Sequence, residues 1–537
     1  MKFKWLFLCW MLVVLVVPNR VFAHASLVQA VPEANAKLAA APAEVSLTFN
    51  ERLEDGLFYI RVFDSAKKQI TNAQAAMNAT HTGVTLKLPS VGDGDYIVTY
   101  HIISADGHPV EGTYLFTVGQ GSGSTSLPED TMANMHHHGE LNGQLEFSDI
   151  IQFASRIIYF IALLLVTGWA VWMHIGRFKE ASVQEWLRKW NVGLQRLFLL
   201  AVIFMMYTHL NDVLGGGGAQ DIAALFTKTG LGISWMVTLV LSLLGFVFVG
   251  RKLWVDVLWA AALLLAKCFN GHAAAFEPRS ETIVLDFVHL AAAAAWVSGL
   301  LLLLRLYSHS KEAAASFYRT FSNVAFISIL LLIVSGILST FIFLPDISYL
   351  AYTQWGGLLI AKMVLVLLVV ITASCIRLLF RKRNMSGLRP WLVLDSVFAL
   401  LIVAVVGVFT YLNPLPANEP LHWHVMGERQ HMTVQITPNV PGNNKFIVSV
   451  WLPEKLGKPK QLLLKLTDLD NPDIAPIEVP VTPFENKIPG EESYGMTKFS
   501  FQAEGRYLPY AGQWNIEVRV MDSNDDETVY DKVIRIY

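Results

Sequence analysis

The sequence predicts a multidomain membrane protein in which two exported β-sandwich domains flank a bundle of eight transmembrane helices. Three observations carry this prediction: an apolar leader opens the 537-residue chain, long apolar runs fill its middle, and strand-like alternating segments lie before and after those runs. Charged residues make up 16% of the chain, whereas soluble proteins average about 25%. This composition excludes a disordered chain, a coiled coil and an ordinary cytosolic enzyme.

The first 23 residues have the pattern of a secretory signal peptide. Lys2 and Lys4 precede an apolar run over residues 5–17, and the small residues Val21 and Ala23 stand three residues and one residue before the expected cut. An uncleaved membrane anchor is the alternative. Cleavage after Ala23 would make residue 24, a histidine, the first residue of the mature chain and would place the following segment outside the cytoplasm.

Residues 24–118 are expected to fold as a β-sandwich. Apolar and polar residues alternate with the period of half-buried strands, and Gly, Pro, Asn and Asp separate the short segments. The clearest segments are residues 45–49, 58–62, 84–88, 96–100 and 112–118. About seven short strands in a segment of this length are typical of a sandwich. Residues 119–147 follow as a Gly/Ser linker that ends in a run of Met and His.

Residues 148–412 contain eight apolar runs, which are long enough to cross a hydrocarbon core of about 30 Å. The runs cover residues 149–174, 194–214, 231–250, 252–270, 284–306, 322–344, 355–379 and 391–412. The fourth run is the shortest. Lys and Arg gather in alternate loops, which by the positive-inside rule places both flanking domains outside. Residues 413–537 alternate again and predict a second small exported β domain.

The first residue of the mature chain is a candidate metal ligand. After cleavage, His24 offers its α-amine and its imidazole Nδ1 together, and such nitrogen donors suit Cu(II) and Ni(II), with Cu(II) at the top of the affinity order. A later turn adds the Asp106 carboxylate and the His108 imidazole around Gly107. His24, Asp106 and His108 therefore form a candidate copper site. The competing interpretation is an ordinary hairpin turn with a surface histidine.

The apolar runs contain polar residues whose burial in a membrane costs free energy, and these residues indicate a metal path. Ionisable groups inside a membrane are functional candidates by default. His209, His272 and His289 are expected near the outer ends of separate runs, and Met205 and Met206 share a helix face with the first of them. The alternatives are interfacial snorkelling, hydrogen bonds between helices and plain packing of the methionines.

A carboxylate accompanies the third of these histidines. Asp286 precedes His289 by three residues and is expected to orient its imidazole ring. Lys362, inside the seventh run, is a candidate ion-pair partner for Asp286. The same structural alternatives apply to this group.

Two further clusters of soft and imidazole donors lie outside the apolar runs. The linker cluster comprises Met132, Met135, His136, His137 and His138. After the last run, His422 and His424 alternate, so on a strand they would lie on one face. Both clusters suit copper, and solvated surface residues are the alternative interpretation.

Several of these motifs resemble the CopC family of extracytoplasmic copper-binding domains. The resemblance covers residues 24–118 and is carried by the mature start His-Ala-Ser-Leu, the strand end Leu-Thr-Phe-Asn-Glu, and the stretch Ser-Ala-Asp-Gly-His-Pro-Val-Glu-Gly followed by Phe-Thr-Val. It implies that His24, Asp106 and His108 bind Cu(II). The methionines of the additional Cu(I) site that some members carry are not matched here.

The remaining chain resembles the membrane partner of that family. Residues 148–412 are similar to CopD, and residues 413–537 are similar to a YtkA-like domain. The matching CopD positions are Asn270, Gly271, His272, Ala273, Asp286, His289, Trp296, Gly299, Gly357 and Lys362. The resemblance implies a fusion of a copper-binding domain with a copper-handling membrane domain.

Together these expectations predict copper uptake across the plasma membrane, without a catalytic residue. Cu(II) is captured outside and passed to the helices, where Cu(I) is also a candidate species. The expected partners are the copper ion, the lipid membrane and an extracytoplasmic copper chaperone. A net charge of −2 speaks against nucleic acid. Two alternatives stay open: extracytoplasmic copper sequestration or resistance without import, and a haem-binding membrane redox protein.

Overall fold

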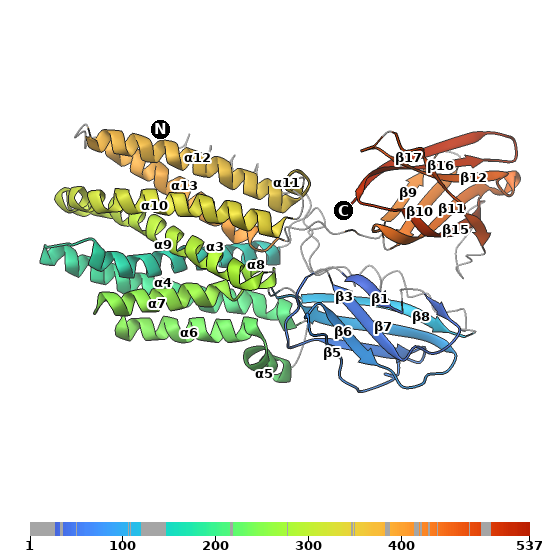
Figure 1. Cartoon of the computed structure of the whole chain (residues 1–537), viewed down its shortest axis with the longest axis horizontal. Coiled ribbons are helices and arrows are strands. Elements are labelled where there is room, and N and C mark those ends of the chain that lie inside the picture. Colours follow the sequence, from blue (N-terminus) through green and yellow to red (C-terminus); the bar gives the residue numbers. More distant parts are fainter. Residues whose placement is uncertain are drawn as a thin grey trace. The chain divides into compact units, whose positions relative to one another are not determined.

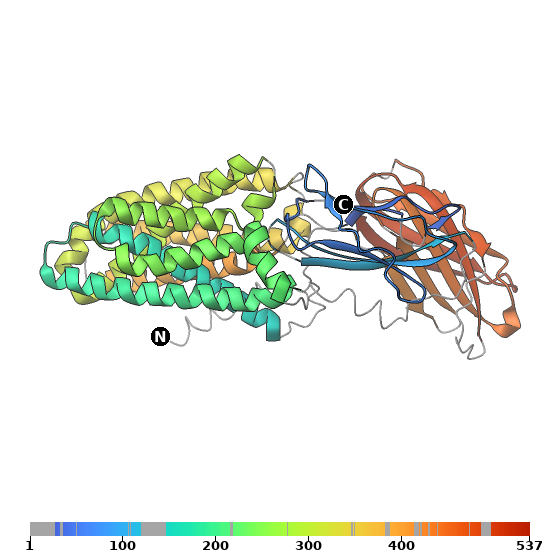
Figure 2. The same cartoon turned by 90° about the horizontal axis from the view of Figure 1, so that it is seen from below.

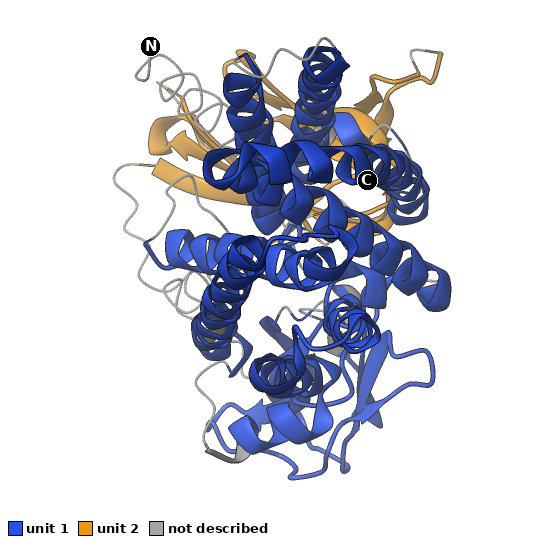
Figure 3. Ribbon diagram, turned by 90° about the vertical axis from the view of Figure 1, so that its left-hand side faces the viewer, with its two compact units in different colours: residues 1–415 blue, residues 416–537 orange. Residues whose placement is uncertain are grey.

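The chain forms two compact units, Met1–Leu415 and Pro416–Tyr537, which Figure 3 colours separately. The computed structural model describes residues 27–32, 36–49, 51–105, 107, 109–119, 147–214, 219–276, 278–344, 347, 349–381, 387–412, 418, 421–427, 430–437, 439–471, 473–484 and 496–537. Several predicted features lie outside these residues: the leader, His24, Asp106, His108 and the linker cluster with His136, His137 and His138. Their roles stay predictions.

The N-terminal part of the first unit is a β-sandwich of two four-stranded sheets, as predicted (Figure 1). The strands are β1 Leu27–Val31, β2 Lys37–Leu38, β3 Glu44–Phe49, β4 Tyr59–Asp64, β5 Ala76–Met77, β6 Gly83–Lys87, β7 Gly94–Ile103 and β8 Pro109–Val118. The sheets have the orders β1-β3-β6-β5 and β2-β8-β7-β4. Alternate side chains such as Val45, Leu47 and Val62 are fully buried between the sheets, because successive residues of a strand face opposite sides.

The rest of the first unit is a helical bundle (Figure 1; Figure 2). Its helices are α3 Phe147–Ile175, α4 Ala181–Leu214, α5 Ala219–Lys228, α6 Gly230–Phe248, α7 Leu253–Cys268, α8 His272–Ala275, α9 Arg279–His309, α10 Lys311–Phe343, α11 Tyr349–Tyr352, α12 Gln354–Arg381 and α13 Leu388–Phe409. Seven of the described helices are long and apolar enough to cross a membrane. The fourth predicted run forms α7, whose 16 residues span only about 24 Å. An eighth crossing therefore stays a prediction.

Helix α3 lies at the centre of the bundle and packs against α4, α7, α9 and α13. Its contact with α9 is unusually close, because a Cβ atom on Gly168 would lie 2.0 Å from the Ser298 hydroxyl and 2.2 Å from the Ala294 carbonyl oxygen. Small residues allow helix backbones to approach in this way inside membranes. The aromatic residues Trp169 and Trp172 then bury their rings between α3 and its neighbours.

The second unit is another two-sheet β fold, which confirms the predicted β-rich C-terminus. Its elements are β9 Leu421–Met426, β10 His431–Thr437, β11 Gly442–Pro453, η1 Glu454–Leu456, β12 Gln461–Asp468, β13 Ile477–Val479, β14 Thr482–Phe484, β15 Met496–Leu508, β16 Gly512–Met521 and β17 Glu527–Ile536. The sheet orders are β14-β15-β11-β10-β9 and β13-β12-β16-β17. Fully buried Trp514, Phe446 and Val448 belong to the core of this unit.

Candidate functional site

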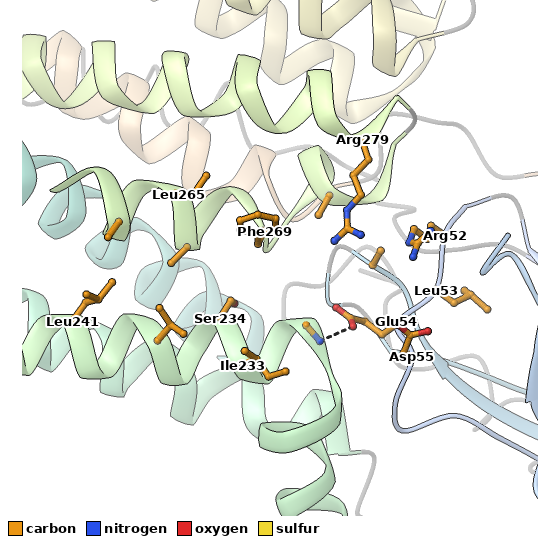
Figure 4. Close-up of a pocket in the computed structure, with 16 residues that line it drawn as sticks. Arg52, Leu53, Glu54, Asp55, Ile233, Ser234, Leu241, Leu265, Phe269 and Arg279 are labelled. Carbon is orange, nitrogen blue, oxygen red and sulfur yellow. Dashed lines mark hydrogen bonds between the residues drawn. The ribbon is translucent and has the colours of Figure 1, made fainter. Parts of the chain in front are cut away.

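Glu54 of the N-terminal domain caps the N-terminal end of the bundle helix α6 (Figure 4). Glu54 accepts hydrogen bonds from the backbone N–H groups of Gly230 at 2.8 Å and Leu231 at 3.1 Å. These are the first residues of α6, whose unpaired N–H groups and positive dipole end favour an anion. Burial raises the pKa of Glu54, while the two N–H groups act in the opposite direction. The carboxylate thereby fixes the domain to the N-terminal end of α6.

Gly107 of the same domain packs on the first turn of α6. Gly107, between the two predicted ligands, has φ +94°, and a Cβ atom there would lie 3.0 Å from Leu231 Cδ1. Only glycine adopts this backbone conformation without strain. The close approach places Gly107 directly beside the start of α6.

A small cavity of about 30 Å³ brings Gly107 together with two residues of the predicted metal path. Gly107 lines it from the N-terminal domain, and Met205 and His209 line it from α4. The other lining residues are Arg156, Tyr159, Phe160, Leu231, Trp235, Lys267 and Asn270. Of the two predicted methionines, only Met205 lines the cavity. We call this group of residues the mouth.

Both ring nitrogens of His209 are engaged in the mouth. Nδ1 lies 2.9 Å from the Met205 carbonyl oxygen, and because a carbonyl oxygen only accepts, Nδ1 is the donor. Nε2 accepts from Arg156 Nη1 at 3.2 Å, since a guanidinium only donates. The lone pair that a metal would need on Nε2 therefore faces the guanidinium. A copper ion that binds there has to displace Arg156.

Arg156 also holds the C-terminal end of α13. Its Nε donates to the Gly407 carbonyl oxygen at 3.2 Å, and Nη2 donates to the carbonyl and hydroxyl oxygens of Thr410 at 2.8 and 3.0 Å. The guanidinium lies 5.4 Å from the centre of the Tyr411 ring. A cation is favoured at a helix C-terminus. Arg156 thus connects His209 on α4 with the end of α13.

The sequence analysis missed Arg156 and Lys267, although both left a signal. Each is a basic residue inside a predicted apolar run, and a charge in such a run is expensive unless it has partners. The same signal had marked the histidines, Asp286 and Lys362 as candidates. The two cations give the mouth a positive character that histidines and methionines alone do not predict.

The other two membrane histidines lie apart from the mouth. His272 Nε2 donates to the Leu412 carbonyl oxygen at 2.8 Å, and His289 Nδ1 shares a 2.9 Å hydrogen bond with the Ser335 hydroxyl. Within the described part of the chain, no group of three or more His, Cys, Asp or Glu side chains could hold a metal ion. The three histidines are therefore separate single donors rather than one multidentate site.

The expected role of Asp286 as the orienting partner of His289 is wrong. His289 turns toward Ser335 of α10, whereas Asp286 forms a side-chain hydrogen bond with Cys268 of α7. Two residues three apart share a helix face only approximately, and these two are drawn to different neighbouring helices. Asp286 does interact electrostatically with Lys362, the predicted partner, and also with Lys267 of the mouth.

In the second unit, His422 and His424 lie exposed on one face of β9, as their alternation predicts, while Trp423 between them is buried. His424 Nδ1 shares a 2.8 Å hydrogen bond with the Thr433 hydroxyl. The His431 ring lies 6.2 Å from the His424 ring. These histidines define an exposed histidine face on β9, which is an edge strand of its sheet.

Profiles of three known domains match the chain. The CopC domain matches residues 27–119, the N-terminal domain of copper resistance protein D-like proteins matches residues 147–282, and copper resistance protein D matches residues 315–409. These matches confirm the resemblance to CopC and CopD in one chain. The likeness of residues 413–537 to a YtkA-like domain stays a prediction.

Individual proteins are similar over different lengths. Copper transport protein CutJ of Bacillus subtilis (strain 168) is 27% identical over 559 residues, which covers 97% of each chain. Protein YobA of Escherichia coli (strain K12) is 34% identical over 106 residues, or 19% of this chain and 85% of its own. Among solved structures, CopC from Methylosinus trichosporium OB3b is 35% identical, covering 19% of this chain and all (100%) of that one, with a TM-score of 0.17.

Proposed function

The chain matches the CopC domain and copper resistance protein D in separate segments, and on this premise we propose that it imports copper across the plasma membrane. CutJ, which resembles it along nearly its whole length, is named a copper transport protein. The apolar helices make this a multi-pass membrane protein. The leader and the distribution of Lys and Arg support an orientation with both β domains outside.

Copper is captured as Cu(II) by the N-terminal domain in this proposal. His24, Asp106 and His108 supply the amine, imidazole and carboxylate donors, a set that suits the divalent ion. The site forms only after the leader is removed, because the α-amine of residue 24 is otherwise an amide. Copper is the cargo of this site and is held until a second set of donors takes it.

The shared cavity is the observation that carries the proposal. Gly107, which separates the two turn ligands, lines the same cavity as Met205 and His209. Because the domain is fixed to α6 beside this cavity, donor and acceptor meet at a high effective concentration. Imidazole and thioether are donors that copper accepts in either oxidation state. Copper thus passes from the turn to the mouth without leaving the protein.

Displacement of Arg156 is the step that admits copper to His209. In the structure, the guanidinium occupies the lone-pair side of Nε2, and Lys267 adds a second positive charge to the mouth. Both charges repel an incoming cation, more strongly in a buried site than in water. When Arg156 moves aside, His209 gains a free lone pair and the end of α13 loses its anchor. His272 and His289 then serve as single donors further along the path.

The test is copper accumulation in cells that lack the gene and are complemented with defined variants. We expect the wild-type chain and Met206→Leu to restore accumulation of radiocopper, and His209→Ala to fail at equal membrane abundance. Met206 is the matched control because it neighbours Met205 without lining the mouth. Full accumulation with His209→Ala would refute the route through the mouth.

Sequestration outside the cell is the second candidate, and the charge of the mouth favours it. Arg156 and Lys267 both line the cavity through which a cation would pass, and the histidine face of the second unit offers additional exposed donors. A chain that only sequesters would bind copper normally and yet leave accumulation inside the cell unchanged. The accumulation experiment therefore separates the two functions.

A further inference from the structure

The outer face of a sheet in the C-terminal unit carries a group of metal donors that the proposed copper route does not use. The strands β9, β10 and β11 are neighbours in this sheet (Figure 1). Trp423 of β9 and Met432 of β10 are buried in the core. Because side chains alternate along a strand, His424 and Met426 of β9 and His431 of β10 lie on the opposite face. Two imidazoles and one thioether therefore share this face.

The register of the strands brings these three side chains close together. His431 pairs directly with Met426, and Cβ atoms at such paired positions are about 4.5–5.5 Å apart. The ring centres of His424 and His431 lie 6.2 Å apart. A metal–imidazole bond of about 2.0 Å places the centres of two rings on one ion about 5–6 Å apart. A small side-chain rotation therefore brings both imidazoles onto one ion, and the flexible Met426, which is 74% exposed, can supply a third donor.

A hydrogen bond on one side of its ring orients His424. Its Nδ1 lies 2.8 Å from the hydroxyl of Thr433, the residue paired with it on β10. Metal-binding histidines commonly donate one ring N–H to a protein oxygen, which fixes the tautomer and leaves the other nitrogen for the ion. When Nδ1 of His424 donates in this way, its Nε2 carries the lone pair. His209 differs, because its Nε2 accepts a hydrogen bond from Arg156.

An aromatic ring borders the three donors. Trp451 of β11 pairs directly with His431, and its ring centre lies 6.2 Å from that of His424. The face of an indole ring attracts a cation. Lys498, on the strand β15 that flanks β11 opposite to β10, has its Nζ 5.0 Å from the centre of the same ring. Its charge repels a monovalent ion about half as strongly as a divalent one, so these surroundings favour a monovalent cation.

From this arrangement we propose that His424, His431 and Met426 bind one Cu(I) ion beside the ring of Trp451. A thioether donor selects Cu(I), and imidazole also accepts copper. The third donor is a methionine, so the site needs no third His, Cys, Asp or Glu side chain. His422 lies further along the same face of β9, away from Met426, and is outside this set. The site is separate from the proposed Cu(II) site and holds Cu(I) whether the chain imports copper or sequesters it.

The test measures the protection of individual histidines in the purified full-length chain. Cu(I) is added without oxygen as its acetonitrile complex, the chain is treated with diethyl pyrocarbonate, and the modification of each histidine is measured by mass spectrometry. We expect Cu(I) to slow the modification of His424 and His431 several-fold. The modification of His422, the matched control on the same strand, should not change. An equal amount of Cu(II) should protect the two ligands much less.

Two variants identify the donor set. Met426→Leu should abolish the protection of both histidines, whereas His422→Ala should keep it. Both substituted residues are exposed, so neither change disturbs the core of the unit. Equal protection of His422, no protection of His424 and His431, or full protection in Met426→Leu would overturn the proposal. Equal protection by Cu(II) would overturn the assigned oxidation state.

Discussion

The two β domains of this chain share an architecture and differ in what surrounds their histidines. The N-terminal sandwich is part of the same compact unit as the helices and contacts α6 through Glu54 and Gly107. The C-terminal fold is a compact unit of its own, with His422 and His424 exposed on a sheet face. In the proposed route, contact with the mouth, rather than the number of histidines in a domain, would decide which domain delivers copper.

The largest expected effect separates the two domains directly. His24→Ala removes the imidazole of the proposed Cu(II) site, so we expect the copper affinity of the full chain to fall on the order of 100-fold, as severe losses at metal sites do. The double variant His422→Ala/His424→Ala should leave this affinity unchanged. Both are measured by competition with a copper chelator. A larger loss in the C-terminal double variant would reverse the comparison.

The next largest effect is expected from removing the thioether donor of the mouth to which the N-terminal domain would pass copper. Met205→Leu removes a thioether from the mouth, and we expect copper accumulation to fall roughly tenfold. Met206→Leu makes the same change on the neighbouring residue and should leave accumulation as in the wild type. Because the two substitutions are chemically identical, equal effects would show that packing rather than the mouth is responsible.

The variant Arg156→Gln tests whether the guanidinium blocks copper binding at His209. We expect the variant to retain several-fold more copper per chain in a His24→Ala background, because the Nε2 lone pair of His209 is no longer covered by a cation. The lost hydrogen bonds to Gly407 and Thr410 should lower the free energy of unfolding by about 1–3 kcal/mol. Copper retained after dialysis and thermal unfolding measure the two effects. Reduced retention in a folded variant would contradict the displacement step.

The smallest effect concerns the contact between domain and helix. The pKa of Glu54 lies above its ordinary value of 4.5 because the effect of burial outweighs the two N–H hydrogen bonds that favour the ionised form. Ionisation of Glu54 therefore weakens the contact on balance. The contribution of the protonated form is full below about pH 4.5 and is lost as the pH rises through the raised pKa. Hydrogen exchange at the start of α6, compared between wild type and Glu54→Gln at each pH, should diverge as the pH rises, with more exchange in the wild type. Identical exchange at every pH would contradict this sign.

Much of the fold was predictable because its periodicities are local. The strand segments at residues 45–49 and 96–100 lie within β3 and β7, and seven apolar runs became helices of sufficient length. The fourth run ended early, since Asn270 and Gly271 follow α7 within three residues. Such strands and helices form because one of their faces is buried. The spacing of apolar residues in the sequence shows directly which face that is.

The arrangement of the mouth was less predictable, because it depends on contacts between distant segments. His209 and Met205 were recognised by their spacing, whereas the closure of α6 by Glu54 joins residues 176 positions apart. Arg156 and Thr410 are separated by 254 positions. Asp286 was assigned to the wrong neighbour, because spacing along one helix does not reveal which adjacent helix a side chain faces.

The central claim, that copper passes from the N-terminal domain through the His209 mouth, is tested most directly in proteoliposomes. Radiocopper is added outside as Cu(II), and copper in the lumen is counted for the wild type, His209→Ala and Met206→Leu. We predict accumulation with the wild type and Met206→Leu, and the level of protein-free vesicles with His209→Ala. Equal accumulation with His209→Ala, or none with the wild type, would contradict the account.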